Sequence, residues 1–263
     1  MLSPLADRTY RHLFAAQVLS LLGTGLLTVA LGLLAFGLAG ADAGAVLGTA
    51  LAIKMVAYVG IAPVAGAFVH LLPRRTLLVL LDLVRAAIAL ALSWVGEVWQ
   101  IYLLIGLLQS CSAAFTPTFQ ATIPDVLIDE AEYTKALSLS RLAYDLEALT
   151  SPVLAAALLS VIGYHWLFAG TVLGFTASAA LVVSVLLPSP KPPVRDEGPW
   201  GRITRGARIY LATPRLRGLL ALNLAVAAAG AMVIVNTVVL VRGALGLGDA
   251  HLAWTLAAYG FGS

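Results

Sequence analysis

Apolar residues in this chain gather into long runs separated by short polar segments. The runs predict membrane-spanning helices at residues 13–38, 46–72, 76–95, 101–123, 136–162, 167–187 and 216–241. A helix needs roughly 20 apolar residues to cross a bilayer, and these runs meet that length. An eighth run begins at Leu252 and is only twelve residues long at Ser263. Because a helix that ends in hydrocarbon leaves carbonyls unpaired, we expect the sequence to be truncated there.

Composition agrees with a membrane protein and excludes several other classes. The chain is 60% hydrophobic and 11% charged, whereas soluble domains are about 45–50% apolar and about 25% charged. The fold class we expect is therefore an all-α polytopic membrane protein. A net charge of +3 does not indicate a nucleic-acid partner, because the basic residues fall in the predicted loops. No metal-ligand spacing, phosphate-binding loop or catalytic constellation is present, so we expect neither a cofactor nor an enzyme.

Basic residues fall almost entirely on one side of the predicted spans. With the N-terminus inside, the inner segments contain Arg8, Arg11, Arg74, Arg75, Lys135, Lys191, Arg195, Arg202, Arg205, Arg208, Arg215 and Arg217. The outer segments contain Arg242 alone. Loops rich in Lys and Arg stay in the cytoplasm, so the pattern predicts a cytoplasmic N-terminus, with Asp42, Glu97 and His165 in outside turns.

A Pro-rich segment of mixed charge divides the chain. It covers residues 188–201, and residues 200–213 after it have the spacing of an amphipathic surface helix. We therefore expect three parts. These are a six-helix transmembrane domain at 1–187, a cytoplasmic linker with the amphipathic helix at 188–215, and the incomplete start of a C-terminal transmembrane domain at 216–263.

The shortest polar link in the chain is Pro73-Arg74-Arg75, between the second and third runs. A link this short predicts an antiparallel helical hairpin that turns at the cytoplasmic face. Asp82 and Arg85 follow in the third run, three residues apart. That spacing places opposite charges on one helix face, near the cytoplasmic end.

This hairpin resembles a known motif. Major facilitator transporters carry a loop of the form Gly-x-x-x-Asp-Arg-x-Gly-Arg-Arg between their second and third helices. Gly66, Arg74 and Arg75 match that form, while His70 stands at the Asp position and Pro73 at a Gly position. Six spans, a cytoplasmic linker and further spans also resemble the two-half arrangement of this superfamily.

Two further segments resemble the drug- and siderophore-exporter branch. The first is Asp-x-x-Arg-Ala from Asp82 to Ala86; the second is the set Ala136, Leu137, Ser138, Arg141 and Pro152. The resemblance implies a cytoplasmic gating network made of Gly66, His70, Arg74, Arg75, Asp82, Arg85 and Arg141. In the family such a network acts as a latch that holds the two halves in the outward-facing state. With His70 in place of an acid, this latch is expected to be weakened or pH-dependent.

Charged residues within spans are costly unless they face protein or water, so they are the first functional candidates. Lys54 lies about eight residues, roughly 12 Å, below the outer end of its span. It either faces a cavity, where it binds an anionic group or joins proton coupling, or it extends its amine to the outer interface. Glu147 and Asp145 are proton-coupling candidates. Asp145 is also positioned to pair with Arg141 as a structural ion pair, whereas Glu147 points some 200° away from it.

Uncharged polar residues complete the candidate set. The resemblance places Gln17, Thr24, Thr28, Gln109, Asn223 and Asn236 on cavity-lining helices, where they are expected to contact substrate. Interhelical hydrogen bonds are the alternative role for each of them.

The function that these patterns favour is proton-coupled export of small molecules by alternating access, in the bacterial inner membrane. The expected partners are a small-molecule substrate, protons, the lipid bilayer and the missing C-terminal half. The alternative is a non-transporting remnant or a membrane scaffold that needs a second chain.

Overall fold

The computed structural model describes residues 2–68, 73–188, 199–238 and 245. Within these residues every regular element is an α-helix or a short 3-10 helix, so the expected all-α class is confirmed. The chain divides into two compact units, Met1–Ile203 and Thr204–Ser263, which are described separately below.

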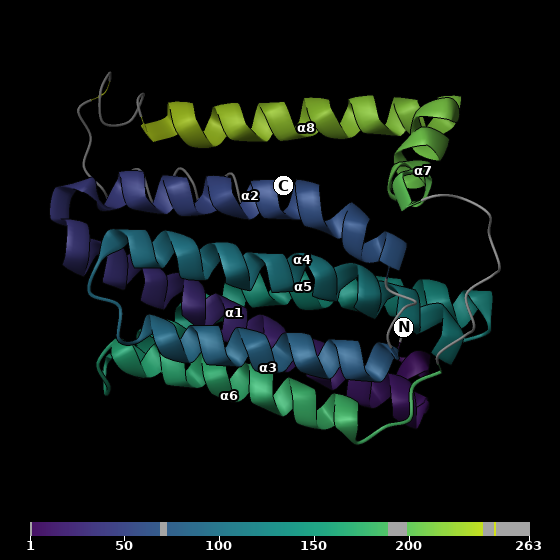
Figure 1. The fold of residues 1–263 in the computed structure, drawn as a ribbon, viewed down its shortest axis with the longest axis horizontal. Helices are drawn as coiled ribbons and strands as arrows, with labels where there is room; N and C mark the ends of the chain where they lie inside the picture. Colours follow the sequence, from purple (N-terminus) through teal and green to yellow (C-terminus); the bar gives the residue numbers. More distant parts are fainter. Residues whose placement is uncertain (1, 69–72, 189–198, 239–244, 246–263) are drawn as a thin grey trace. The chain divides into compact units, whose positions relative to one another are not determined.

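The first unit is a bundle of six long helices (Figure 1). Their bounds are Arg8–Ala39 for α1, Ala43–Phe68 for α2, Arg74–Leu92 for α3, Val98–Val126 for α4, Glu130–Leu159 for α5 and His165–Val183 for α6. The helices occur in the predicted order, each within a few residues of the apolar run that predicted it. By length and composition α1, α2, α4, α5 and α6 are apolar enough to cross a membrane. α3 is not among them, because its 19 residues include four charged ones.

The link between α4 and α5 is much shorter than the sequence suggested. The apolar runs at 101–123 and 136–162 left residues 124–135 as a charged loop between the two helices, but α4 continues to Val126 and α5 begins at Glu130. The carboxylate of Asp129 accepts a hydrogen bond from the backbone of Glu132 at 3.0 Å, which satisfies one of the free N–H groups at the start of α5. The loop prediction was therefore wrong, because charged residues at the end of a helix were taken for a loop.

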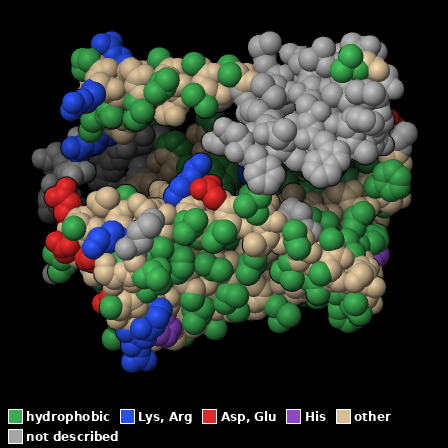
Figure 2. All heavy atoms as spheres, turned by 180° about the vertical axis from the view of Figure 1, so that it is seen from behind, with side chains coloured by type: hydrophobic (Ala, Val, Ile, Leu, Met, Phe, Trp, Pro, Cys, Tyr) green, Lys and Arg blue, Asp and Glu red, His purple; other side chains and the backbone are tan. Residues whose placement is uncertain are grey.

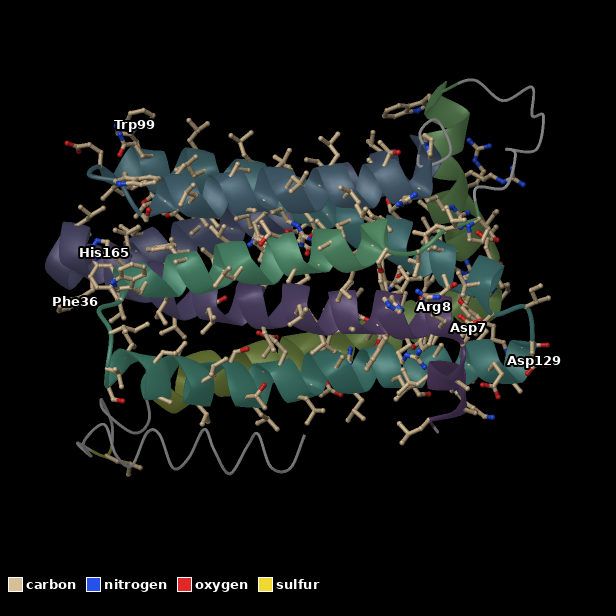
Figure 3. All side chains as sticks on the ribbon, turned by 90° about the horizontal axis from the view of Figure 1, so that it is seen from below. Asp7, Arg8, Phe36, Trp99, Asp129 and His165 are labelled. Carbon is tan, nitrogen blue, oxygen red and sulfur yellow. The ribbon has the colours of Figure 1, made fainter. Side chains whose placement is uncertain are left out.

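The two ends of the bundle carry different residues (Figure 3). Asp7, Arg8 and Asp129 lie at one end, and Trp99 and His165 lie at the other. Asp7 caps α1 by accepting a hydrogen bond from the backbone of Tyr10 at 2.7 Å. This division matches the predicted sidedness, in which the N-terminus and the α4–α5 link share one face of the membrane.

Packing within the unit depends on close helix crossings. α1 packs against α5 and α6, α4 packs against α2 and α3, and α3 also contacts α6. At the α1–α6 crossing the hydroxyl of Thr171 donates to the carbonyl of Gly23 at 2.9 Å. A Cβ added to Gly174 would lie 2.7 Å from the carbonyl oxygen of Leu19. Glycines therefore let the two backbones approach, as in other helix pairs of membrane proteins.

The outer surface is largely apolar. Figure 2 shows hydrophobic side chains spread over the face in view, and large apolar side chains such as Val59, Leu149 and Val153 are exposed. Helices surrounded by lipid tolerate such exposure, because the bilayer core is as apolar as the side chains.

The second unit contains α8 (Pro214–Val238) and most of α7 (Pro199–Ala212), which begins in the first unit. α7 confirms the helix predicted at residues 200–213. The expected eighth span, which starts at Leu252, lies outside the described residues.

Candidate functional site

A polar cavity lies among five helices of the first unit. It measures about 160 Å³ and is lined by Gln17, Ser20, Leu21 and Thr24 of α1, Lys54 and Tyr58 of α2, Arg85 of α3, Gln109, Ser112, Phe115 and Thr116 of α4, and Tyr144 and Glu147 of α5. The structure thus brings six of the sequence-predicted site residues to one place. Five are cavity or proton-coupling candidates, namely Gln17, Thr24, Lys54, Gln109 and Glu147, and the sixth is Arg85 of the expected gating network.

The remaining candidates are not part of the described lining of this cavity. Thr28 is exposed, and its hydroxyl donates to the carbonyl of Thr24 at 3.0 Å. Asp145 is exposed and lines no cavity with Glu147. Asn223 belongs to α8 in the second unit, with an exposed side chain. The side chain of Asn236 lies outside the described residues, as does the whole of His70.

A second cavity adjoins the first. It measures about 230 Å³ and shares Gln17, Phe115, Thr116 and Tyr144 with it, while Phe119, Gln120, Leu137, Ser140 and Arg141 complete its lining. The hydroxyl of Ser140 donates to Oε1 of Gln17 at 3.0 Å, and both side chains are buried. Gln17 therefore forms the interhelical hydrogen bond considered from sequence and also lines both cavities. Because Gln120 and Leu137 lie in the last third of α4 and the first third of α5, the polar space extends toward the α4–α5 link.

Arg85 is the most enclosed charge in the cavity wall. Its side chain is 4% exposed and pairs with Asp82, which is fully buried. Asp82 also accepts a hydrogen bond from the hydroxyl of Ser178 on α6, at 2.7 Å. The guanidinium carbon lies 4.2 Å from the ring centre of Phe115 and 4.5 Å from that of Phe175. Aromatic faces and a paired carboxylate thus replace water around the cation.

The described contacts of Asp82 differ from those expected for the gating network. The sequence placed Asp82 and Arg85 with the loop that carries Arg74 and Arg75, near the cytoplasmic end. The hydrogen bonds of Asp82 within the described residues are instead to Arg85 and Ser178. The pair is internal because its face of α3 packs against α4 and α6, and a buried pair must find its partners inside the bundle.

Arg74 and Arg75 make a separate set of contacts at the start of α3. Arg74 donates to the carboxylate of Asp125 and to the carbonyl of Ala121. Arg75 donates to the carbonyl of Val183. The N-terminus of α3 is thereby bonded to the C-terminal parts of α4 and α6, and the carbonyl of Val183 is one of those that lack a helical partner at the end of α6.

Asp125 was missed in the sequence, because the residues around it were assigned to a loop. A signal was available in the sequence. Asp125 lies at the cytoplasmic end of the fourth run, and in an up-and-down arrangement of helices that end is on the same side of the membrane as Arg74 and Arg75. Gly66 is another member of the expected network, and a Cβ added to it would have no described neighbour within 4 Å.

Two acidic residues of α5 have different surroundings. Asp145 pairs with Arg141 at 3.4 Å, as the spacing predicted, but the side chains are 59% and 81% exposed. Exposed pairs of this kind contribute little to stability. Glu147 is half-buried against α1, where a Cβ added to Gly25 would lie 2.5 Å from its Oε1. Glu147 also borders an apolar groove between α1 and α5 that includes Phe14.

No group of three or more His, Cys, Asp or Glu residues is arranged to hold a metal ion within the part of the chain that the structure describes.

Apolar helices around a charged polar cavity are the arrangement of a membrane transporter. The family model described as Major Facilitator Superfamily matches residues 13–263, and the chain belongs to this family. It is also similar to the uncharacterized MFS-type transporter YfiS of Bacillus subtilis (strain 168), with 28% identity over 121 residues. That alignment covers 46% of this chain and 28% of the relative, so the similarity concerns only a part of the relative's length. Family membership points to a transporter rather than an enzyme.

Proposed function

We propose that this chain is part of a secondary active transporter that exports small molecules by alternating access, driven by protons. The observation that carries the proposal is the cavity in which Lys54, Arg85 and Glu147 come together from three helices. Ionisable groups inside a membrane bundle are costly, and they mark substrate and proton pathways.

Glu147 is the proposed proton site. Its carboxylate lies between the polar cavity and the apolar groove of α1 and α5. The other ionisable groups of the cavity wall are Lys54, Tyr58, Arg85 and Tyr144. When water enters the cavity, it solvates the ionised carboxylate. When water leaves, a buried negative charge is unfavourable, and protonation of the carboxylate removes that charge. Its charge state can therefore follow the side to which the cavity opens. Asp145, which is exposed and paired, lacks this property.

The contacts at the start of α3 serve as the proposed cytoplasmic latch. Arg74 and Arg75 bond α3 to α4 and α6, so these three helices would move as one body when the cavity changes its access. Rigid-body movement of one helical bundle against another is the usual form of alternating access.

The finer assignments rest on sequence. The segment from Asp82 to Ala86 supports the drug- and siderophore-exporter branch. The one-sided distribution of Lys and Arg supports a cytoplasmic N-terminus, and the bacterial inner membrane is the proposed location. Transport in the proposal requires a second six-helix half, to which residues 216–263 contribute.

Proton flux in proteoliposomes tests the proposal. The chain, completed by a second half, is reconstituted with a pH-sensitive dye inside the vesicles, and a panel of small organic acids, amines and neutral aromatics is added under a pH gradient. We expect at least one compound to start a proton flux with the unmodified chain and not with Glu147→Gln. The same flux in both proteins would contradict the proposed coupling at Glu147.

A further inference from the structure

We propose that the central cavity binds the negatively charged group of an organic anion, with Lys54 and Arg85 as the donors. This inference rests on the proposed transport function, because it names the substrate class of the same site.

The first observation is an unsatisfied donor in the cavity wall. Arg85 is 4% exposed, and its Nη2 donates to Asp82. Its Nε is buried and makes no hydrogen bond to any described residue. A buried donor without a partner destabilises a protein, and an oxygen that accepts its hydrogen removes that cost. Because the side chain lines the cavity, a small shift of the guanidinium would bring this donor to an anion held there.

Lys54 provides a second donor from another helix. It is half-buried on α2 and lines the same cavity. Its ammonium takes part in no ion pair with the described residues. A lysine that extended to the interface would lie away from the cavity, whereas this one shares its wall with Arg85.

The charged groups of the wall favour an anion over a cation. Lys54 and Arg85 are the cations of the described lining, and Glu147 is its acid. Asp82, which offsets Arg85, does not line the cavity. Asp82 neutralises Arg85. Because Glu147 also carries a charge opposite to that of Lys54, the preference comes from hydrogen-bond donors and not from net charge. An anion meets charged donors on two helices, whereas a cation meets one carboxylate.

The size and the apolar part of the wall define the body of the ligand. Tyr58, Phe115 and Tyr144 supply ring surface beside the two donors. A volume of about 160 Å³ is smaller than the roughly 300–1,000 Å³ of pockets for drug-sized ligands. The cavity therefore suits a small aromatic acid or the anionic head of a larger one. Outward movement of a negative charge is also favoured by a membrane potential that is negative inside.

The test compares three probes of one shape: benzoate, benzyl alcohol and benzylamine. Their binding to the purified chain in detergent is measured from the ligand-dependent rise in unfolding temperature. We expect benzoate to bind and benzylamine not to bind. Loss of a charge-assisted hydrogen bond in Lys54→Gln should weaken benzoate by about tenfold or more, while Lys54→Arg should retain binding. Lys135→Gln is the matched control, because it removes one positive charge from an exposed site outside the cavity.

Two results would overturn the inference. One is stabilisation by benzylamine but not by benzoate, and the other is unchanged benzoate affinity in a folded Lys54→Gln protein. The proteoliposome assay separates this inference from the proposed function. If benzoate binds in a way that depends on Lys54 but no substrate starts a proton flux, the anion site is supported and proton-driven export is refuted. If benzylamine is exported in a proton-driven manner at the same rate by the unmodified and the Lys54→Gln proteins, export is supported and the anion site is refuted.

Discussion

The guanidinium of Arg85 lies 4.2 Å from the ring centre of Phe115, across the interface between α3 and α4. Phe175 of α6 covers the same cation at 4.5 Å. A desolvated cation over an aromatic face is stabilised by about 2 kcal/mol. The contacts of Arg85 with the two rings therefore help to hold α3, α4 and α6 together. The cation is neutralised by Asp82 of its own helix, and this makes its burial possible.

The buried pair gives the first prediction. Asp82→Asn should lower the free energy of unfolding by about 3 kcal/mol, because it leaves the guanidinium buried without its counter-charge. Thermal unfolding in detergent measures the loss, and proton flux in proteoliposomes should fall with it. The double variant Asp82→Asn/Arg85→Gln removes both charges and should recover part of the stability. An unfolding temperature unchanged by Asp82→Asn would show that Ser178 and the rings hold Arg85 without the carboxylate.

The second prediction concerns the proposed latch between Arg74 and Asp125, whose side chains are 14% and 29% exposed. Asp125→Asn should slow transport while changing stability by only about 1 kcal/mol, since the pair is partly solvated. The exchange Arg74→Asp/Asp125→Arg should restore part of the rate. Glu132→Gln, in the more exposed pair with Lys135, is the control and should leave the rate unaltered. Equal effects of Asp125→Asn and Glu132→Gln would refute a latch.

The α1–α6 crossing gives the third prediction. Gly174→Ala places a Cβ 2.7 Å from the backbone oxygen of Leu19, so the helices must separate. Overpacking of this kind costs about 1–3 kcal/mol. Gly48→Ala is the control, because nothing lies within 4 Å of its added Cβ. Unfolding temperatures should fall for Gly174→Ala and stay the same or rise for Gly48→Ala; the opposite order would contradict the close crossing.

The proposed proton site gives the fourth prediction. Glu147→Gln should abolish proton-driven efflux and preserve substrate binding, because the amide keeps the shape and loses the titration. Asp145→Asn is the matched control two residues away, and it should lower efflux little. Dye-reported proton flux and ligand-dependent unfolding measure the two properties separately. Normal pH-dependent efflux in Glu147→Gln would make Glu147 a structural residue.

Topology provides the fifth prediction. In a Cys111→Ser background, single cysteines at Asp42, Glu97 and His165 should react with an impermeant maleimide added outside intact cells. A cysteine in the linker at residues 188–201 should react only after the cells are opened. Labelling of the linker, but not of Glu97, from outside would reverse the orientation.

The sequence by itself determined the number, order and type of the described helices in the first unit. Apolar length is a local property, because a span must match the thickness of the bilayer whatever its neighbours are. Polar and charged residues within spans were also recognisable, since each is costly in lipid. Lys54 and Glu147 were selected in this way, whereas Gln17, Thr24 and Gln109 were selected from the family resemblance. The structure places all five on one cavity.

Tertiary structure alone decided which of these groups meet. Spacing along one helix predicted the pairing of Asp82 with Arg85, but not its burial beside Ser178 and two phenylalanines from other helices. Asp125 meets Arg74 because α4 continues into the segment that was expected to be a loop. Thr28 was expected to line the cavity, but its side chain is exposed on another face of α1. Partners across helices depend on the rotation and crossing of each helix, which close packing of the whole bundle fixes and a local pattern does not contain.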